Sequence, residues 1–131
     1  MDETDQQILK ILKKNSRMSY IDIAEKVDLS EGAVRKRIDN LKKDGVIKRF
    51  TIETSAQTEG LVIIRIDPAK TREAAKEVKN YAERVYELSG EWDVVAWLYA
   101  SDIRELNEKV DKIREISGIL DTSTLIKMKE H

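Results

Sequence analysis

The sequence predicts an α+β fold of two modules, an N-terminal winged helix-turn-helix and a C-terminal ferredoxin-like βαββαβ domain. Residues 1–45 carry apolar side chains at helical spacing, whereas later residues alternate apolar runs typical of strands with two helical stretches. Residues 1–52 hold twelve Lys or Arg and nine Asp or Glu, against twelve and sixteen in residues 53–131. A basic first half and an acidic second half indicate modules with different roles.

Three helices are predicted in the first module, and each begins after a capping residue. Thr4 begins the first helix, because Gln7 stands three residues later at the spacing of a capping box. Ser19 begins the second helix and Ser30 the third, which Gly45 ends in a left-handed conformation. Their inner faces predict one small core, formed by Ile8, Leu9, Ile11, Leu12, Ile23, Ala24, Val27, Val34, Ile38 and Leu41.

The segment after the third helix predicts a strand and then a hinge. In "VIKRFTIE", residues 46–53, the β-branched and aromatic alternation is typical of a strand or a small hairpin. The next stretch, "TSAQTEG", is polar and lacks an apolar period, so residues 54–60 are interpreted as a hinge between the modules. The predicted domains are therefore residues 1–53 and 61–131, on either side of that hinge.

The second module is predicted to have the order β-α-β-β-α-β. Its strands are expected at residues 61–67, 84–89, 93–100 and 119–128. Thr71 and Ser101 are expected to cap its two helices, whose inner faces are Ala75, Val78 and Ala82 in the first and Ile103, Leu106, Val110 and Ile113 in the second. These helices cover one face of the sheet. A second copy of the chain is the simplest cover for the other face, which predicts a homodimer.

The third predicted helix separates its basic side chains from its apolar row. On a wheel of ~100° per residue, a row centred on Val34 and Ile38 lies opposite a polar face. That face and its flanks carry Gly32, Arg35, Lys36, Arg37, Asn40 and Lys43. With a helix and turn before it, and with Lys48 and Arg49 on the predicted wing, this pattern indicates a surface that binds DNA. The alternative is a solvated face that only keeps the helix soluble.

Several classes of function are disfavoured by what the chain lacks. It has no cysteine and its single histidine is His131, so disulfides, thiolate zinc sites and histidine-dependent catalysis are not expected. It has no phosphate-binding glycine loop and no calcium-loop spacing, so no enzyme, metal site or cofactor is predicted. No apolar run approaches the length of a membrane span, and the first residues are polar, which favours a cytoplasmic protein without a membrane partner.

A resemblance to a known family covers nearly the whole chain. The first fifty residues resemble the N-terminal half of the Lrp/AsnC family of leucine-responsive regulators. The matching residues are spaced without gaps and are Asp2, Asp5, Ile8, Leu9, Asn15, Arg17, Ile23, Ala24, Leu29, Ser30, Val34, Arg37, Leu41, Gly45, Val46 and Ile47. "SGEWDVVAWLYA", residues 89–100, is similar to the family's glycine-x-aromatic-aspartate turn and hydrophobic strand. "SGILDTSTLIKM", residues 117–128, resembles its final loop and threonine-bearing strand.

The resemblance implies a transcriptional regulator that binds double-stranded DNA as a dimer or a higher assembly. It implies DNA contacts by Ser30, Gly32, Arg35, Lys36 and Arg37. It also implies an amino-acid effector bound near Gly90, Trp92, Asp93, Thr122 and Thr124. The expected function is sequence-specific DNA binding that responds to a small molecule, namely an amino acid. The alternative is an architectural DNA-binding protein of the same fold that ignores small molecules, and an enzyme or small-molecule carrier is disfavoured.

The expected effector residues also have plainer interpretations. Asp93 either accepts hydrogen bonds from an ammonium group or is an ordinary turn acid bonded to nearby backbone. Trp92 either lines a ligand site or covers a dimer interface. Thr122 and Thr124 are common β-strand formers, and only the resemblance gives them a role. Arg65, inside an apolar strand, requires an acidic partner or an exposed edge.

Overall fold

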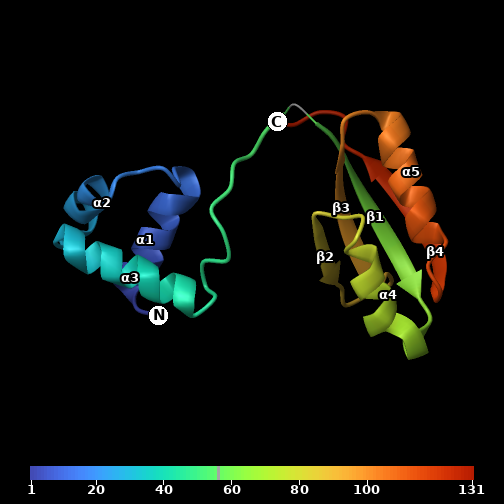
Figure 1. The fold of residues 1–131 in the computed structure, drawn as a ribbon, viewed down its shortest axis with the longest axis horizontal. Helices are drawn as coiled ribbons and strands as arrows, with labels where there is room; N and C mark the ends of the chain where they lie inside the picture. The colour runs from blue at the N-terminus through green and yellow to red at the C-terminus, as the bar shows by residue number, and fades with distance from the viewer. Residues whose placement is uncertain (56) are drawn as a thin grey trace. The chain divides into compact units, whose positions relative to one another are not determined.

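The computed structural model describes residues 1–55 and 57–131, which form two compact units with separate hydrophobic cores (Figure 1). Unit 1 comprises Met1–Glu53 and unit 2 comprises Thr54–His131. The segment interpreted as a hinge, residues 54–60, includes residue 56, which lies outside the described residues. No helix in the described parts of either unit is long and apolar enough to cross a membrane.

Unit 1 is helical, and its residues, all of which are described, form α1 (Glu3–Lys14), α2 (Tyr20–Val27) and α3 (Glu31–Lys43). The predicted cap of α2 is confirmed, because Oγ of Ser19 accepts a hydrogen bond from the Asp22 backbone at 3.1 Å. Oγ of Ser30 caps α3 in the same way by accepting from the Ala33 backbone at 3.1 Å. Gly45 follows α3 with φ +74°, as predicted.

The predicted start of α1 at Thr4 is wrong, because the helix begins earlier. Asp2 is the cap, and its carboxylate accepts from the Asp5 backbone at 2.8 Å while the Asp5 carboxylate accepts from the Asp2 backbone at 3.5 Å. An acid at each end of this capping box satisfies two backbone donors and places negative charge at the positive end of the helix. Thr4 and Gln7 match the spacing but lie inside the helix.

The helices pack around a core in which Ile8, Ile23, Val34 and Ile38 are at most 1% exposed. Between α2 and α3 the chain turns at Asp28, which has the left-handed values φ 56° and ψ 50°. This short turn sets α3 across α2, the arrangement of a helix-turn-helix.

The strand predicted for residues 46–53 does not form. The backbones of Val46 and Ile47 both donate to the Leu41 carbonyl at 3.0 Å, which ties the start of the segment to the end of α3. Beyond them Phe50 is 48% exposed and Ile52 79% exposed. Unit 1 contains no strand with which this segment could pair, and an unpaired strand leaves its backbone groups to water.

Unit 2 has the predicted βαββαβ order. Its described residues form an antiparallel sheet in the order β2-β3-β1-β4, built from β1 (Thr58–Ile66), β2 (Arg84–Glu87), β3 (Val94–Ala100) and β4 (Ile119–Ile126). A 3₁₀ turn, η1 (Pro68–Lys70), precedes α4 (Thr71–Val78), and α5 (Ile103–Arg114) connects β3 to β4. Both α-helices lie on one face of the sheet (Figure 1).

Residues 58–60 belong to β1 and not to a hinge, so the interpretation of residues 54–60 is wrong at its end. Gly60 pairs with Leu98 on one side and with Ile126 on the other. A Cβ at this position would lie 3.0 Å from Cδ2 of Leu106, so the glycine lets α5 pack closely on the strand. The polar composition and the glycine therefore predicted a loop where the structure has a paired strand.

Both predicted caps in unit 2 are wrong by a residue or more. Thr71 follows η1, which Asp67 caps by accepting from the Ala69 backbone at 3.0 Å. Asp102, not Ser101, caps α5. Two residues predicted on the inner faces of these helices do not lie there. Ala82 lies beyond the end of α4, and Ile103, the first residue of α5, is 46% exposed.

The two faces of the sheet differ in cover. The side chains of Val62, Ile64 and Ile66 point under the helices and are at most 2% exposed. On the opposite face, Leu61 pairs with Trp97 and is only partly buried within one chain, as is Trp97 itself. Within the described residues of unit 2, no helix covers this open apolar face.

Candidate DNA interface and ligand site

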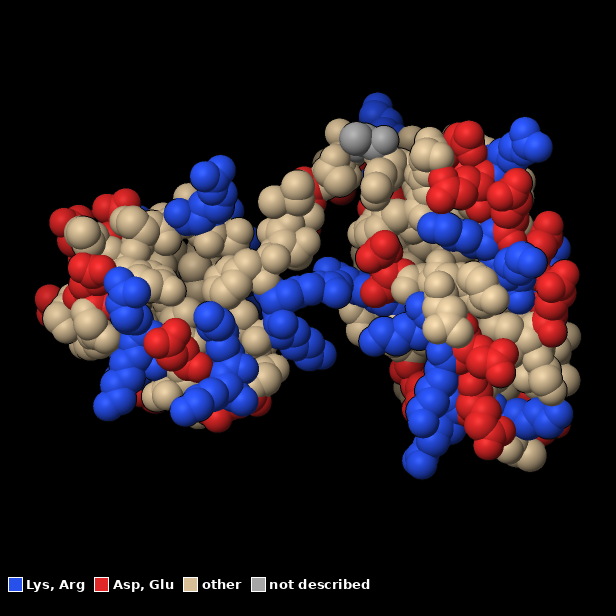
Figure 2. All heavy atoms as spheres, in the orientation of Figure 1, with Lys and Arg blue, Asp and Glu red and all other residues tan. Residues whose placement is uncertain are grey.

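The outer face of α3 carries polar side chains that are free to contact another molecule. Lys36, Asn40 and Lys43 are all exposed, and no hydrogen bond or ion pair holds their side chains within residues 1–53. Around Gly32 an added Cβ would meet nothing within 4 Å, so the helix surface is open there. Figure 2 shows Lys and Arg side chains projecting from the side of unit 1 where α3 lies, with acidic side chains between them. Such a surface suits phosphate and base-edge contacts.

Ser30 and Arg35 are partly engaged within the unit. Oγ of Ser30 accepts from the Ala33 backbone as the cap of α3. Arg35 donates to Glu31 at 2.9 Å and lies over the Tyr20 ring at 4.8 Å. The side chains of the Arg35–Glu31 pair are 56% and 47% exposed. An exposed pair of this kind is worth little in water, so Arg35 can exchange it for a phosphate.

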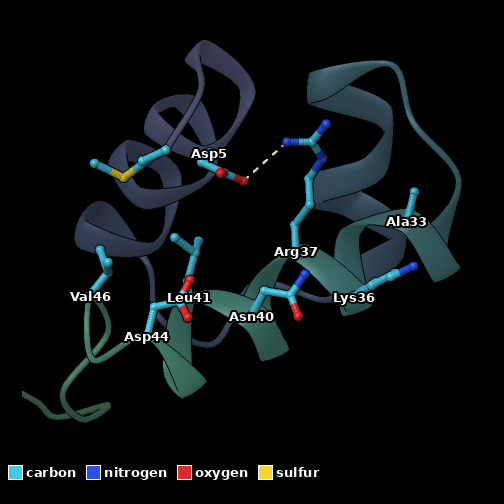
Figure 3. A pocket seen from close by; sticks show the side chains of 9 residues that line it. Asp5, Ala33, Lys36, Arg37, Asn40, Leu41, Asp44 and Val46 are labelled. Carbon is cyan, nitrogen blue, oxygen red and sulfur yellow. Dashed lines mark hydrogen bonds and ion pairs between the residues drawn. The ribbon is translucent and has the colours of Figure 1, made fainter.

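Arg37 is held more firmly. Its Nη1 donates to the two carboxylate oxygens of Asp2 at 2.9 and 2.7 Å and to Oδ1 of Asp5 at 3.1 Å. Figure 3 shows the Arg37 guanidinium directed toward Asp5 of α1, across a pocket that Lys36 and Asn40 also line. Arg37 is therefore bound within unit 1, unlike the free side chains beside it.

Lys48 and Arg49 do not lie on a wing strand. Both are exposed in the segment after α3, where no strand forms. No hydrogen bond or ion pair fixes either side chain to the rest of residues 1–53. Their positive charges follow α3 closely in the chain and can still add to the attraction for DNA.

At one end of the sheet in unit 2, Asp93 fastens a turn to β1. Its Oδ2 accepts from the Ile66 backbone at 2.8 Å, and its own backbone donates to the Ile64 carbonyl at 2.9 Å. The pairing of β1 with β4 shifts register between Arg65 and Ile66, so the carboxylate satisfies a backbone donor at this irregularity. Oδ2 of Asp93 therefore bonds backbone, whereas Oδ1 accepts no hydrogen bond from the described residues.

Arg65 fastens the same turn through its side chain. Its Nη2 donates to Glu91 at 2.8 Å, and its guanidinium lies 4.7 Å from the centre of the Trp92 ring. The acidic partner of Arg65 is thus within its own chain. Two consecutive residues of β1, Arg65 and Ile66, hold three consecutive residues of the turn, 91–93. Sequence reasoning found the need for a partner but had no signal for this one.

The two threonines lie on the helix-covered face of β4. Thr122 pairs with Ile64, and its Oγ1 accepts from Nε of Arg114 at 3.0 Å. Ile64 also pairs with Val94, so Thr122 lies roughly 10 Å across the sheet from the end of the Asp93 turn. Thr124 pairs with Val62 one row further in, and its Oγ1 is buried with no hydrogen-bond partner among the described residues.

The turn and Thr122 therefore lie at one end of the sheet, while Thr124 lies further along it. Gly90 belongs to the turn and has φ +121°, a conformation that glycine adopts without strain. Among the described residues, no group of three His, Cys, Asp or Glu side chains is placed to hold a metal ion.

Comparison with known proteins places both units. Residues 1–48 match the family described as winged helix-turn-helix DNA-binding, and residues 59–131 match the Lrp/AsnC ligand binding domain. The chain belongs to the Lrp/AsnC family. Its first unit is the DNA-binding part that the family descriptions name and its second is the ligand-binding part. A member of the Lrp/AsnC family with both parts is a DNA-binding transcriptional regulator.

Individual Lrp/AsnC relatives match over nearly their whole length. The HTH-type transcriptional regulator LysM of Sulfurisphaera tokodaii is 39% identical over 134 aligned positions, covering 98% of this chain and 96% of LysM. The HTH-type transcriptional regulator FL11 of Pyrococcus furiosus is 30% identical and covers 100% of this chain and 91% of its own.

Solved structures confirm the predicted α+β fold class. The crystal structure of PH0061 superposes with a TM-score of 0.90 at 24% identity, covering 100% of this chain and 95% of that one. The structure of E. coli AsnC gives 0.74 at 22% identity, covering 99% and 93%.

Proposed function

We propose that this Lrp/AsnC regulator binds double-stranded DNA in a sequence-specific way through the outer face of α3 and responds to an amino acid bound at the turn of residues 88–93. The observation that carries the second part is the fastening of residues 91–93 to Arg65 and Ile66. A turn held at several points is preorganised, so binding a small ligand there costs little ordering. A solved structure of this fold, the regulator NMB0573 of Neisseria meningitidis at 24% identity and a TM-score of 0.79, is described as a complex with L-Met.

The turn also carries groups of both charges that a zwitterion requires. An α-ammonium group needs acceptors, and Oδ1 of Asp93 accepts no hydrogen bond from the described residues. An α-carboxylate needs donors, and Arg65 is paired with Glu91, whose side chain is 76% exposed. Because so exposed a pair contributes little, a ligand carboxylate can replace Glu91 without a large loss.

We further propose that the chain assembles as a homodimer or a higher homo-oligomer. The open face of the sheet holds apolar side chains that are only partly buried in one chain, among them Leu61, Ile63, Val95 and Trp97. Burying such a face against a second copy removes apolar area from water. The mass of the protein in solution tests the assembly directly.

The test of the ligand response uses a DNA duplex selected by the full chain from a random-sequence pool. The affinity of the full chain for this duplex is measured at fixed salt, with and without each of the twenty amino acids. We expect one amino acid, or a few of similar shape, to change the affinity or the size of the complex. A selected duplex bound equally in all twenty titrations would favour an architectural protein, and failure to select any sequence would contradict specific recognition.

A further inference from the structure

Arg37 differs from Arg35 on the same helix in being bound to another helix. Arg35 pairs with Glu31 inside α3, whereas Arg37 makes three hydrogen bonds to Asp2 and Asp5 at the start of α1. We propose that Arg37 is a positioning residue and not a DNA contact: with Asp2 and Asp5 it fixes α3 against α1 in the orientation that reads DNA. This inference rests on the proposal that α3 faces the DNA.

The three residues form one connected network. Asp2 and Asp5 are the two members of the capping box that begins α1, so each carboxylate bonds backbone as well as Arg37. The side-chain bond from Arg37, and then the bond from the Asp5 backbone, hold the pKa of Asp2 below its ordinary value. The bonds to both acids raise the pKa of Arg37. Asp2 and Arg37 therefore both carry their charges at neutral pH.

Two of the three members, Arg37 and Asp5, are better shielded than the Arg35–Glu31 pair, whereas Asp2 is 57% exposed. The side chain of Arg37 is 32% exposed and that of Asp5 is 17% exposed, against 56% for Arg35. The contacts are charge-assisted and converge on Nη1, so they link the Arg37 side chain of α3 to both acids of α1. DNA would have to break three such bonds to recruit Arg37, and that cost disfavours its use as a phosphate contact.

The position of α3 matters because the side chains proposed to face DNA lie next to the network of Asp2, Asp5 and Arg37. Lys36 and Asn40 line the same pocket as Asp5 and Arg37, and neither has a partner within residues 1–53 (Figure 3). A turn of α3 about its axis would carry both side chains away from the bases or phosphates they meet. Contacts to DNA lose most of their value when groups are misplaced by about an ångström.

The proposed role of Asp2 and Asp5 and simple electrostatics predict opposite changes in DNA affinity when the two acids are removed. Acids near a DNA-binding surface repel phosphates, so removing Asp2 and Asp5 should strengthen DNA binding if they only carry charge. If they position α3, removing them should weaken it. The variant Asp2→Asn with Asp5→Asn is suited to this test because asparagine caps a helix about as well as aspartate.

The experiment measures the affinity of the full chain for the selected duplex at several salt concentrations. We expect the double variant to bind roughly tenfold more weakly at each salt, which is about 1.4 kcal/mol. The control is Glu3→Gln, which removes one negative charge from the same helix turn, where Glu3 has no ion pair within residues 1–53. It should bind as well as the wild type or slightly better. Equal or tighter binding by the double variant would overturn the proposal.

The salt dependence separates a positioning residue from a phosphate contact. Losing one phosphate contact lowers the slope of log affinity against log salt by about 0.9. Arg37→Gln should weaken binding and leave that slope unchanged. Arg37→Lys should restore much of the affinity, because the three contacts converge on Nη1 and a lysine ammonium carries enough donors to replace them. A slope lowered by about 0.9 in Arg37→Gln would assign Arg37 to the DNA.

Two further measurements keep the outcome clear. Circular dichroism melting of each variant sets a temperature at which all of them are folded, so that affinity is compared between folded proteins. Lys36→Gln tests the placement of α3 separately and should weaken binding. If Lys36→Gln binds DNA with unchanged affinity, the proposed DNA face of α3 is wrong. The inference about Arg37 is then wrong too, even if the Asp2, Asp5 and Arg37 variants bind more weakly.

Discussion

At the scale of single residues, Asp28 occupies a backbone conformation that L-residues rarely adopt. Its φ of 56° and ψ of 50° lie in the left-handed region. The turn requires this conformation, because the Leu29 backbone donates to the Ala24 carbonyl at 3.0 Å only when the chain reverses there. Aspartate tolerates the left-handed region better than most residues, yet its Cβ still crowds the neighbouring carbonyl.

Glycine at position 28 should therefore stabilise unit 1. We expect Asp28→Gly to raise the free energy of unfolding by about 0.5 kcal/mol, since relief of backbone strain outweighs the added freedom of the unfolded chain. Urea denaturation followed by helix circular dichroism measures the change. The control is Lys26→Gly inside α2, which should instead lower stability by roughly 1 kcal/mol. A loss of stability in Asp28→Gly would show that the aspartate side chain contributes more than its strain costs.

Residues that act locally could be predicted from the sequence, and those with distant partners could not. The caps Ser19 and Ser30 depend on a backbone donor three residues away, so local spacing was sufficient. The prediction that Thr4 begins the first helix was wrong, because Asp2 and Asp5 on either side of it form the capping box. Arg37 was predicted to lie on a flank of the polar face of α3 and to contact DNA. Its bonds to Asp2 and Asp5 span 35 and 32 residues, a separation that local spacing cannot reveal.

At the scale of elements, the turn between β2 and β3 is fastened to two consecutive residues of β1, Arg65 and Ile66. The Arg65 side chain reaches the turn from the open face, and the Ile66 backbone donates to the Asp93 carboxylate. The turn backbone also closes on itself, because Leu88 donates to the Asp93 carbonyl at 2.8 Å. The shape of the proposed ligand site thus depends on β1 as much as on the turn.

Removing the Arg65 guanidinium should loosen this turn without unfolding the sheet. We expect Arg65→Met to speed amide hydrogen exchange at Leu88 and Asp93 by roughly five- to tenfold, since an exposed ion pair and a cation–π contact together contribute about 1 kcal/mol. Arg84→Met is the matched control, because Arg84 lies over the Trp97 ring of the same sheet at 5.8 Å. It should leave both rates unchanged. Equal rates in the wild type and Arg65→Met would mean that the backbone bonds alone hold the turn.

Elements were predictable where their neighbours are close in the chain or strongly apolar. The order βαββαβ followed from buried runs such as β1 and β3, whose alternate residues fill the core. Residues 46–53 had the composition of a strand but no strand to pair with, so composition alone misled. Residues 58–60 had the composition of a loop yet joined β1, because β3 and β4 supply partners on both sides.

At the scale of the whole chain, the described residues divide into two separate hydrophobic cores. The core of unit 1 is built from helices alone, with Ile8, Ile23 and Ile38 at its centre. The core of unit 2 lies between the sheet and its two α-helices, and it contains more buried residues. A small helical domain buries a smaller fraction of its surface than a larger one and is correspondingly less stable.

The two units should therefore unfold at different urea concentrations. Both tryptophans, Trp92 and Trp97, belong to unit 2, so their fluorescence follows that unit alone, whereas helix circular dichroism follows both units. We expect the circular dichroism transition to begin at lower urea than the fluorescence transition, because unit 1 unfolds first. Superimposable transitions would show that the units unfold together and stabilise each other.

The separation of the two cores has a consequence for the history of such chains. A substitution that repacks one core needs no compensating change in the other, so each unit can accumulate mutations on its own schedule. Recombination within the polar stretch between them would exchange one ligand-binding unit for another while leaving the helix-turn-helix unit intact. Chains of this design can acquire a new chemical signal in a single genetic event, by inheriting a second half already shaped elsewhere.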